Sequence, residues 1–502
     1  MKRITSIGLF LISALAFGCG PSGSGPGGGA GAKDPSGKAI TDSKGNPIPV
    51  EAANKFKQGL DSLAQHDKAK DWDEATCTST AQIFLDAAKE HEKPFAEALY
   101  NAGLAYQRCK KSAEAKAQFQ KAVDADPKFH PAKTQLVMLS YYESGEKNID
   151  QAITDMRQTA VVDAQYKNVE ALVALAMLYM KRGNTVADND GASDYQRAKR
   201  YLQSALAVDD GYMPAFNQLA LFYLDSAKQA AGQAKSSKSA TNIGKKKKTD
   251  SQAMELADLV CSQAIRKNPN DPVIYNTMGM IQVELGNLNK AVEAFDRARQ
   301  RDPNFYEAQM NFAAVNLQFR GFSKSEEAYR AVLKNRPNDY DARLGLALAL
   351  RGQINDSNFD AFVKEAAENL AKAKEIAPDR PETYYNEAIL TQEYKTKGTS
   401  DPTKAKPILL QAKDLFGQFV TKAGGASEYS DAVKRAKERI TEIDQIIVFN
   451  EQTEKERKQA EAEAKQKAAE AEAAGANDEA GGTGAADKPA GGTPAPDNKP
   501  PQ

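Results

Sequence analysis

Small and apolar residues in the middle of the chain recur in one order at a fixed spacing. In each of two stretches, a glycine is followed 12 residues later by an alanine and 24 residues later by a proline. Apolar positions within each half lie three or four residues apart, as on one face of a helix. Proline cannot continue a helix, so it marks where the second helix of a pair ends. The two stretches are Leu99, Ala102, Gly103, Tyr106, Ala115, Phe119, Ala122 and Pro127, and Tyr275, Gly279, Ala291, Phe295, Ala298 and Pro303.

This spacing resembles the tetratricopeptide repeat, a pair of antiparallel helices about 34 residues long. Small residues at the glycine and first alanine positions let the two helices approach closely, and aromatic residues fill the space between pairs. Looser copies begin near Leu172, Phe216, Phe312 and Leu346, and a weaker one covers 130–168. The resemblance implies an all-α fold, a right-handed superhelical solenoid of about eight or nine antiparallel helix pairs.

The composition along the chain predicts five parts. Residues 1–18 are a signal peptide, 19–50 a flexible tether rich in Gly, Pro and Ser, and 51–426 the repeat solenoid. Residues 427–475 are a capping helix with a charged helical extension, and 476–502 are a disordered low-complexity tail. A disordered insertion interrupts the solenoid at about 226–250 and contains Lys245 to Lys248. This lysine run is either a solvated loop or a basic contact for an anionic partner.

The N-terminus predicts export and a lipid anchor. Lys2 and Arg3 precede an apolar run from Ile4 to Phe17 that is too short to span a membrane, and Cys19 follows it. The run and its cysteine resemble the bacterial lipobox, although Ala16 and Phe17 depart from its usual residues. The resemblance implies acylation of Cys19, whereas the alternative is an ordinary signal peptide with a plain thiol. Under the sorting rule of enteric lipoproteins, Gly20 implies the outer membrane, facing the periplasm.

Charge and residue usage argue against several classes of function. The 67 basic and 67 acidic residues cancel, which removes the electrostatic basis for nucleic-acid binding. Three histidines and the lack of CxxC, HExxH or P-loop motifs leave few candidates for metal binding or acid–base catalysis. We therefore expect a non-enzymatic protein with no catalytic residues, no cofactor and no metal.

The other three cysteines fall at informative positions. Cys261 occupies the large-residue position of a second helix and is expected to be a buried thiol. Cys77 and Cys109 lie near corresponding turns of successive units, and stacked repeats bring such turns together. An oxidising periplasm would permit a Cys77–Cys109 disulfide. The alternative is two unrelated small residues.

The family resemblance also implies a concave binding groove lined by positions 5, 9 and 12 of each first helix. In this chain these positions form a mostly apolar, Met-rich stripe, typical of an adaptable interaction surface. The alternative is a tight superhelix in which the stripe packs on itself or on the terminal helix. The predicted groove residues are Val173, Met177, Met180, Asn217, Leu221, Leu224, Asn276, Met280, Val283, Met310, Leu317, Leu344 and Leu348, together with Ala314 and Arg351.

The combination of anchor, repeats and polar tail is similar to the tetratricopeptide-repeat lipoproteins of the gliding-motility machinery of myxobacteria. The resemblance implies an anchored scaffold whose partners are envelope proteins, namely outer-membrane barrels and periplasmic subunits of a multiprotein complex. Two alternatives remain: a pilotin or outer-membrane assembly accessory lipoprotein, and an activator of a cell-wall enzyme. No motif in the chain decides between them.

Overall fold

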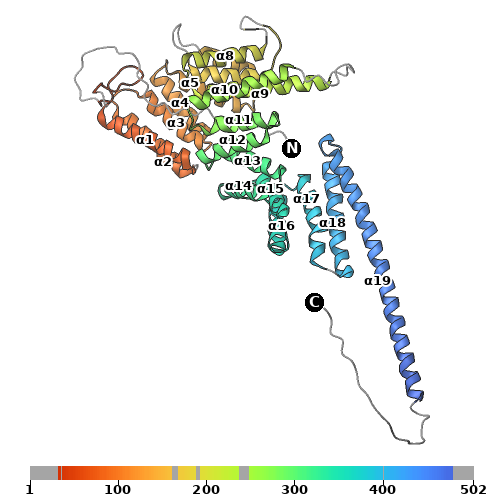
Figure 1. Cartoon of the computed structure of the whole chain (residues 1–502). Coiled ribbons are helices and arrows are strands. Elements are labelled where there is room, and N and C mark those ends of the chain that lie inside the picture. Colours follow the sequence, from red (N-terminus) through yellow and green to blue (C-terminus); the bar gives the residue numbers. More distant parts are fainter. Residues whose placement is uncertain are drawn as a thin grey trace, which may run out of the picture. The chain divides into compact units, whose positions relative to one another are not determined.

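The computed structural model describes residues 32–34, 37–69, 71–160, 168–187, 191, 193–236, 248–399 and 401–478. The chain divides into two compact units between Gln353 and Ile354. Helices of the first unit pack in chain order, each on the next (Figure 1). The all-α solenoid predicted from the sequence is confirmed. Its helices in unit 1 are α1 Val50–Ala69, α2 Glu74–Glu90, α3 Ala96–Arg108, α4 Ser112–Ala125, α5 His130–Glu143, α6 Ile149–Ala160, α7 Val169–Arg182, α8 Asp194–Val208, α9 Met213–Ser236, α10 Lys248–Lys267, α11 Pro272–Glu284, α12 Leu288–Arg301, α13 Tyr306–Gln318, α14 Phe322–Asn335 and α15 Tyr340–Gly352.

Glycine allows the two helices of a repeat to approach closely. A Cβ atom placed on Gly279 in α11 would lie 2.5 Å from the ring of Phe295 in α12. Gly103 makes the same close contact, because a Cβ atom placed on it would lie 2.6 Å from the ring of Phe119. Both rings are almost fully buried. The repeated glycine and aromatic positions of the sequence therefore encode one packing contact, made again in successive pairs.

The described residues of this segment, 32–34 and 37–48, are folded, so the predicted flexible tether is wrong for this part of 19–50. Two successive turns, at Gly37 and Gly45, have positive φ and are closed by short antiparallel bridges. Ile48 is fully buried in the core of α1–α3. The composition of these turns is typical of a linker, but the isoleucines that follow them, Ile40 and Ile48, pack against the first helices. We call residues 32–34 and 37–48 the N-terminal strap.

Helix α9 runs to Ser236 and α10 begins at Lys248. The predicted insertion at 226–250 is therefore too wide at both ends, because helix-forming Ala, Gln and Lys residues extend the helices into it. Residues 237–247, with Lys245 to Lys247, lie outside the described part of the chain.

The second unit ends in a long helix that packs on the helix before it. Ala436, Ile443 and Ile447 of α19 are buried against the core around Phe416 of α18. Lys406 and Lys413 of α18 pair with the carboxylates of Glu451 and Asp444 of α19. The segment predicted as a cap thus lies on the apolar face of its neighbour. The elements of unit 2 are α16 Phe359–Ile376, α17 Pro381–Glu393, η1 Lys395–Gly398, α18 Pro402–Ala423, η2 Ser427–Tyr429 and α19 Ser430–Asp478.

Candidate partner-binding surface

The predicted groove residues lie on the first helices of five successive pairs, α7, α9, α11, α13 and α15. Acidic or amide caps fix where three of these helices begin. Asn168 accepts a hydrogen bond from the backbone of α7, Asp271 from that of α11 and Asp339 from that of α15. The caps set the register of each helix, and the register decides which side chains face the same way. We call the face that carries the predicted groove residues the inner face.

Four of the predicted groove residues are buried and cannot be contacted from solvent. Val173 is 0% exposed, Leu224 and Asn217 are each 3% exposed, and Asn276 is 7% exposed. Val173 and Leu224 belong to the hydrophobic core of the unit. The prediction of an exposed stripe is therefore wrong at these four positions, because their side chains pack into the core or bond to the neighbouring first helices.

The other predicted groove residues are half-buried. Several of them, including Met177, Met180, Leu221 and Met280, pack along one side against the core. Their remaining surface is apolar, and unbranched Met side chains adapt to irregular partners. They provide a narrow apolar strip on five helices, less exposed than the sequence predicts. The half-buried residues are Met177, Met180, Leu221, Met280, Val283, Met310, Leu317, Leu344 and Leu348, with Ala314 and Arg351.

The amides of the inner face contact one another. The Thr277 hydroxyl donates to Asn217 Oδ1, and Asn311 Nδ2 donates to Asn276 Oδ1 at 2.9 Å. These bonds connect neighbouring first helices, so the carbonyl oxygens of Asn217 and Asn276 already accept from the chain itself. Asn217 Nδ2 is different, because it is buried and finds no hydrogen-bond partner among the described residues.

Toward α3 the inner face is filled by the chain's own polar side chains. Tyr100 of α3 donates to Glu170 of α7 at 3.4 Å, reaching past α5. Gln107 of α3 also donates to Gln135 of α5 at 3.2 Å. Burial raises the pKa of the Glu170 carboxyl to about 7. These contacts hold α3, α5 and α7 together and leave the apolar strip to the later helices.

The three described cysteines form one disulfide-bonded pair and one buried free thiol. Cys77 of α2 and Cys109, which caps α3, form a disulfide with their Cα atoms 6.2 Å apart. That separation is ordinary for a disulfide. Cys261 is a fully buried free thiol whose pKa is raised by that burial, so it is unreactive. Cys19 and the signal peptide lie outside the described residues.

A buried ion-pair cluster, not predicted from the sequence, lies where α7 and α8 meet. Asp194 is 0% exposed and accepts from Arg182 at 2.7 Å and from Arg197 at 2.5 Å. Arg197 also donates to the carbonyls of Val186 and Gly191, which fixes part of the connection between the helices. Nothing in the local pattern distinguishes these three charges from surface residues. Their role is structural, because their donors and acceptors are turned toward one another.

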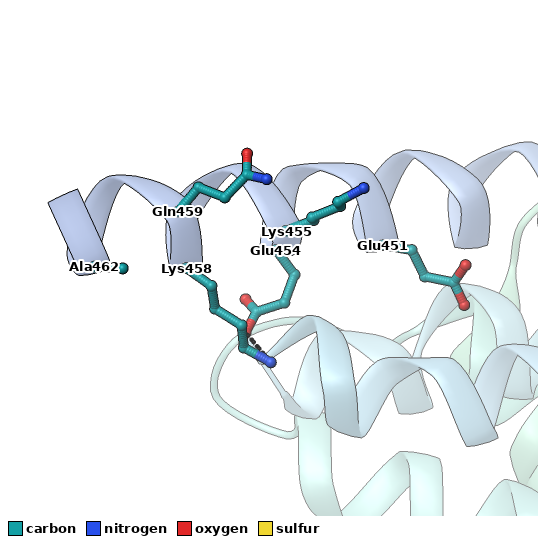
Figure 2. Close-up of a pocket in the computed structure, with 6 residues that line it drawn as sticks. All are labelled: Glu451, Glu454, Lys455, Lys458, Gln459 and Ala462. Atoms are coloured by element: carbon teal, nitrogen blue, oxygen red, sulfur yellow. Dashed lines mark ion pairs between the residues drawn. The ribbon is translucent and has the colours of Figure 1, made fainter.

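The side chains drawn in Figure 2 line a shallow hollow on α19. The volume of this hollow is about 420 Å³. All the side chains that line it come from this one helix, and Glu454 pairs within the helix with Arg457 and Lys458. A hollow on a single helix provides no convergent groups, so we do not assign the functional site to it. The lining residues are Glu451, Glu454, Lys455, Lys458, Gln459 and Ala462.

The described residues contain no group of three or more His, Cys, Asp or Glu side chains placed to hold a metal ion. No helix among them is both long and apolar enough to cross a membrane.

The fold and the inner face define a helical-repeat protein with a surface for protein partners. Tetratricopeptide-repeat family models match residues 96–129, 260–293 and 316–381. These matches show tetratricopeptide repeats within the chain, as its sequence pattern predicts. No curated protein matches it.

Solved structures with similarity to the chain include other repeat proteins. One is a thermophilic TPR protein of Thermus thermophilus, with 21% identity, 44% of this chain and 99% of that chain covered, and a TM-score of 0.34. Another is a tetratricopeptide repeat protein from Parabacteroides merdae, with 13% identity, 62% and 98% covered, and a TM-score of 0.35. A third is MamA from Desulfovibrio magneticus, with 20% identity, 39% and 94% covered, and a TM-score of 0.29.

Proposed function

We propose that this protein is a non-enzymatic, lipid-anchored scaffold of the periplasm that binds protein partners through the inner face of its repeats. The observation that supports this most is the half-buried apolar strip on α7, α9, α11, α13 and α15. Repeat arrays bind through area and complementarity, and they require no reactive groups for it. The strip is rich in Met, which suits a partner that must fit an irregular surface.

The cellular compartment and the protein complex to which this protein belongs are further parts of the proposal. The lipobox-like sequence at Cys19 supports an anchor, and Gly20 supports the outer membrane. The overall organisation is most like the adventurous gliding motility lipoprotein called GltE, which supports a place in a trans-envelope motility complex. A Cys77–Cys109 disulfide suits the oxidising periplasm that this location implies.

The inner face is tested by photo-crosslinking in cells. A benzophenone amino acid is placed at Met280 on the inner face, and a matched control carries it at Leu259, which is 49% exposed on α10. The proposal predicts that Met280 captures one or more envelope proteins that Leu259 does not capture. Capture at Leu259 with none at Met280 would show that partners dock elsewhere on the solenoid.

The anchor is tested separately by membrane fractionation of the native protein and the Cys19→Ala variant. The proposal predicts that the native protein lies in the outer-membrane fraction and that the variant is released from it. If both proteins are released and capture the same partners, the anchor is refuted and a free adaptor remains. Zymography on peptidoglycan with and without the protein detects activation of a cell-wall enzyme.

A further inference from the structure

The N-terminal strap is held on the first helices by polar groups as well as by its isoleucines. Asp42, in the second turn of the strap, lies against His91 at the end of α2, with Oδ2 and Nε2 3.5 Å apart. Ser43 donates through Oγ to Oδ2 of Asp126, at the end of α4, at 2.7 Å. The second turn of the strap therefore joins the ends of two helices that are not neighbours in the chain.

Three carboxyl groups come together beneath this turn. Asp42 and Asp126 are 6% and 7% exposed, and both act as negative charges on Glu97 in the first turn of α3. The Oε2 atom of Glu97 is buried as well. Like charges that share a site shielded from water do not all ionise, so one carboxyl keeps its proton to a higher pH than the others.

Hydrogen bonds identify Glu97 as the carboxyl that keeps its proton. Asp42 accepts from the backbone N–H of Asn46 at 2.7 Å and from its side-chain amide at 2.8 Å. Asp126 accepts from the backbone N–H of Lys128 at 2.9 Å. Such donors favour a charged carboxylate, whereas Oε2 of Glu97 finds no partner among the described residues. Burial raises the pKa of the Glu97 carboxyl to about 7, and the two aspartates raise it further.

The positive and dipolar groups around the contact do not offset this burial. Lys93 is exposed and donates to the second turn of the strap at 2.7 Å, and Glu92 beside it is acidic. Burial lowers the pKa of His91, so its ring is neutral at neutral pH. The backbone N–H groups of Ser43 and of Glu97 itself favour the charged carboxyl, but burial outweighs them.

We propose that the strap is a proton-controlled latch, in which a neutral Glu97 carboxyl holds the second turn on α3 and its ionisation releases that turn. An ionised Glu97 in the closed contact faces Asp42 and Asp126 without water to separate the charges. Because the docked strap binds this proton more tightly than the released strap does, docking loses stability as the pH rises from about 4.5 to 7.

Release of the strap lengthens the link between the N-terminal segment and the repeats. Residues 32–48, extended at about 3.3–3.6 Å each, span about 55–60 Å. This consequence rests on the proposed lipid anchor at Cys19, whereas the latch itself does not. With the anchor in place, the pH of the envelope sets how far the repeats can stand from the membrane.

Hydrogen exchange at the strap measures the latch. The backbone N–H groups of Ile40 and Ile48 donate to the carbonyls of Ala32 and Ile40, so they exchange when the strap opens. Their protection factors are measured in the full chain at about pH 6 and about pH 8, each corrected for the pH dependence of intrinsic exchange.

The decisive variant is Glu97→Gln, which keeps the shape of the side chain and removes its ionisation. Its comparison with the native protein at each pH cancels the contribution of His91, which both proteins share. With a pKa of about 7 in the docked strap and 4.5 after release, native protection relative to Glu97→Gln should fall about tenfold between the two pH values. The matched control is Glu114→Gln on α4, an exposed residue, which should behave as the native protein does.

A ratio that stays constant with pH, or an equal effect of Glu114→Gln, would refute the latch and leave the proposed function standing. Loss of strap protection in Glu97→Gln at both pH values would also refute it, because the ionised carboxylate would then be what holds the strap. Conversely, a Cys19→Ala protein that stays in the membrane fraction refutes the anchor and leaves the latch as a property of the fold.

Discussion

Replacing Gly279 by Ala tests the close contact between the two helices of one repeat. The new Cβ atom would lie 2.5 Å from the Phe295 ring, about 0.9 Å inside the 3.4 Å at which ordinary contact begins. The ring is 1% exposed, so it has little room to turn away. Overpacking of this kind costs about 1–3 kcal/mol, and the better helix propensity of Ala returns up to about 1 kcal/mol. We expect a net loss of about 1–2 kcal/mol.

The matched control is Gly417→Ala in α18, where an added Cβ would meet nothing within 4 Å. This substitution should stabilise its helix by up to about 1 kcal/mol, so the two variants differ in sign. Hydrogen exchange read on peptides from α11, α12 and α18 measures both. Adding Phe295→Leu to Gly279→Ala should recover part of the loss. Equal stabilisation by both glycine substitutions would refute the close contact of Gly279 with the Phe295 ring, because helix propensity alone would then explain both results.

Three further predictions concern buried groups. Cys109→Ser should destabilise the first helices by about 3–4 kcal/mol, since the Cys77 bridge closes a loop of about 32 residues; two free thiols in non-reducing peptide mapping would contradict the bridge. Asp194→Ala should cost about 3–5 kcal/mol in urea unfolding, because it removes the carboxylate that pairs with the buried guanidinium of Arg197, and a cost below about 1 kcal/mol would contradict a buried pair. Folding raises the pKa of the Glu170 carboxyl from 4.5 to about 7, so the folded state binds this proton more tightly than the unfolded state. The free energy of unfolding therefore falls by about 3 kcal/mol as the pH rises from about 4.5 to 7. Glu170→Gln should flatten this slope, and an unchanged slope would assign it to other groups.

The repeat architecture could be predicted because each pair carries its own local signal. Gly103 with Phe119 and Gly279 with Phe295 are fixed by spacing within one repeat, and the prolines that follow fix the ends. Such contacts depend on residues a few turns apart in the same pair. The sequence therefore indicates them without knowledge of the whole chain.

The exposure of the inner face could not be predicted in the same way. Whether Val173 or Asn217 is buried depends on how sharply successive pairs rotate, and that rotation accumulates over many repeats. The hydrogen bond from Asn304 Nδ2 to the Ala69 carbonyl joins residues 235 positions apart, which no local pattern connects. The N-terminal strap was missed for a related reason, since Ile48 is buried by residues of helices beyond its own turn.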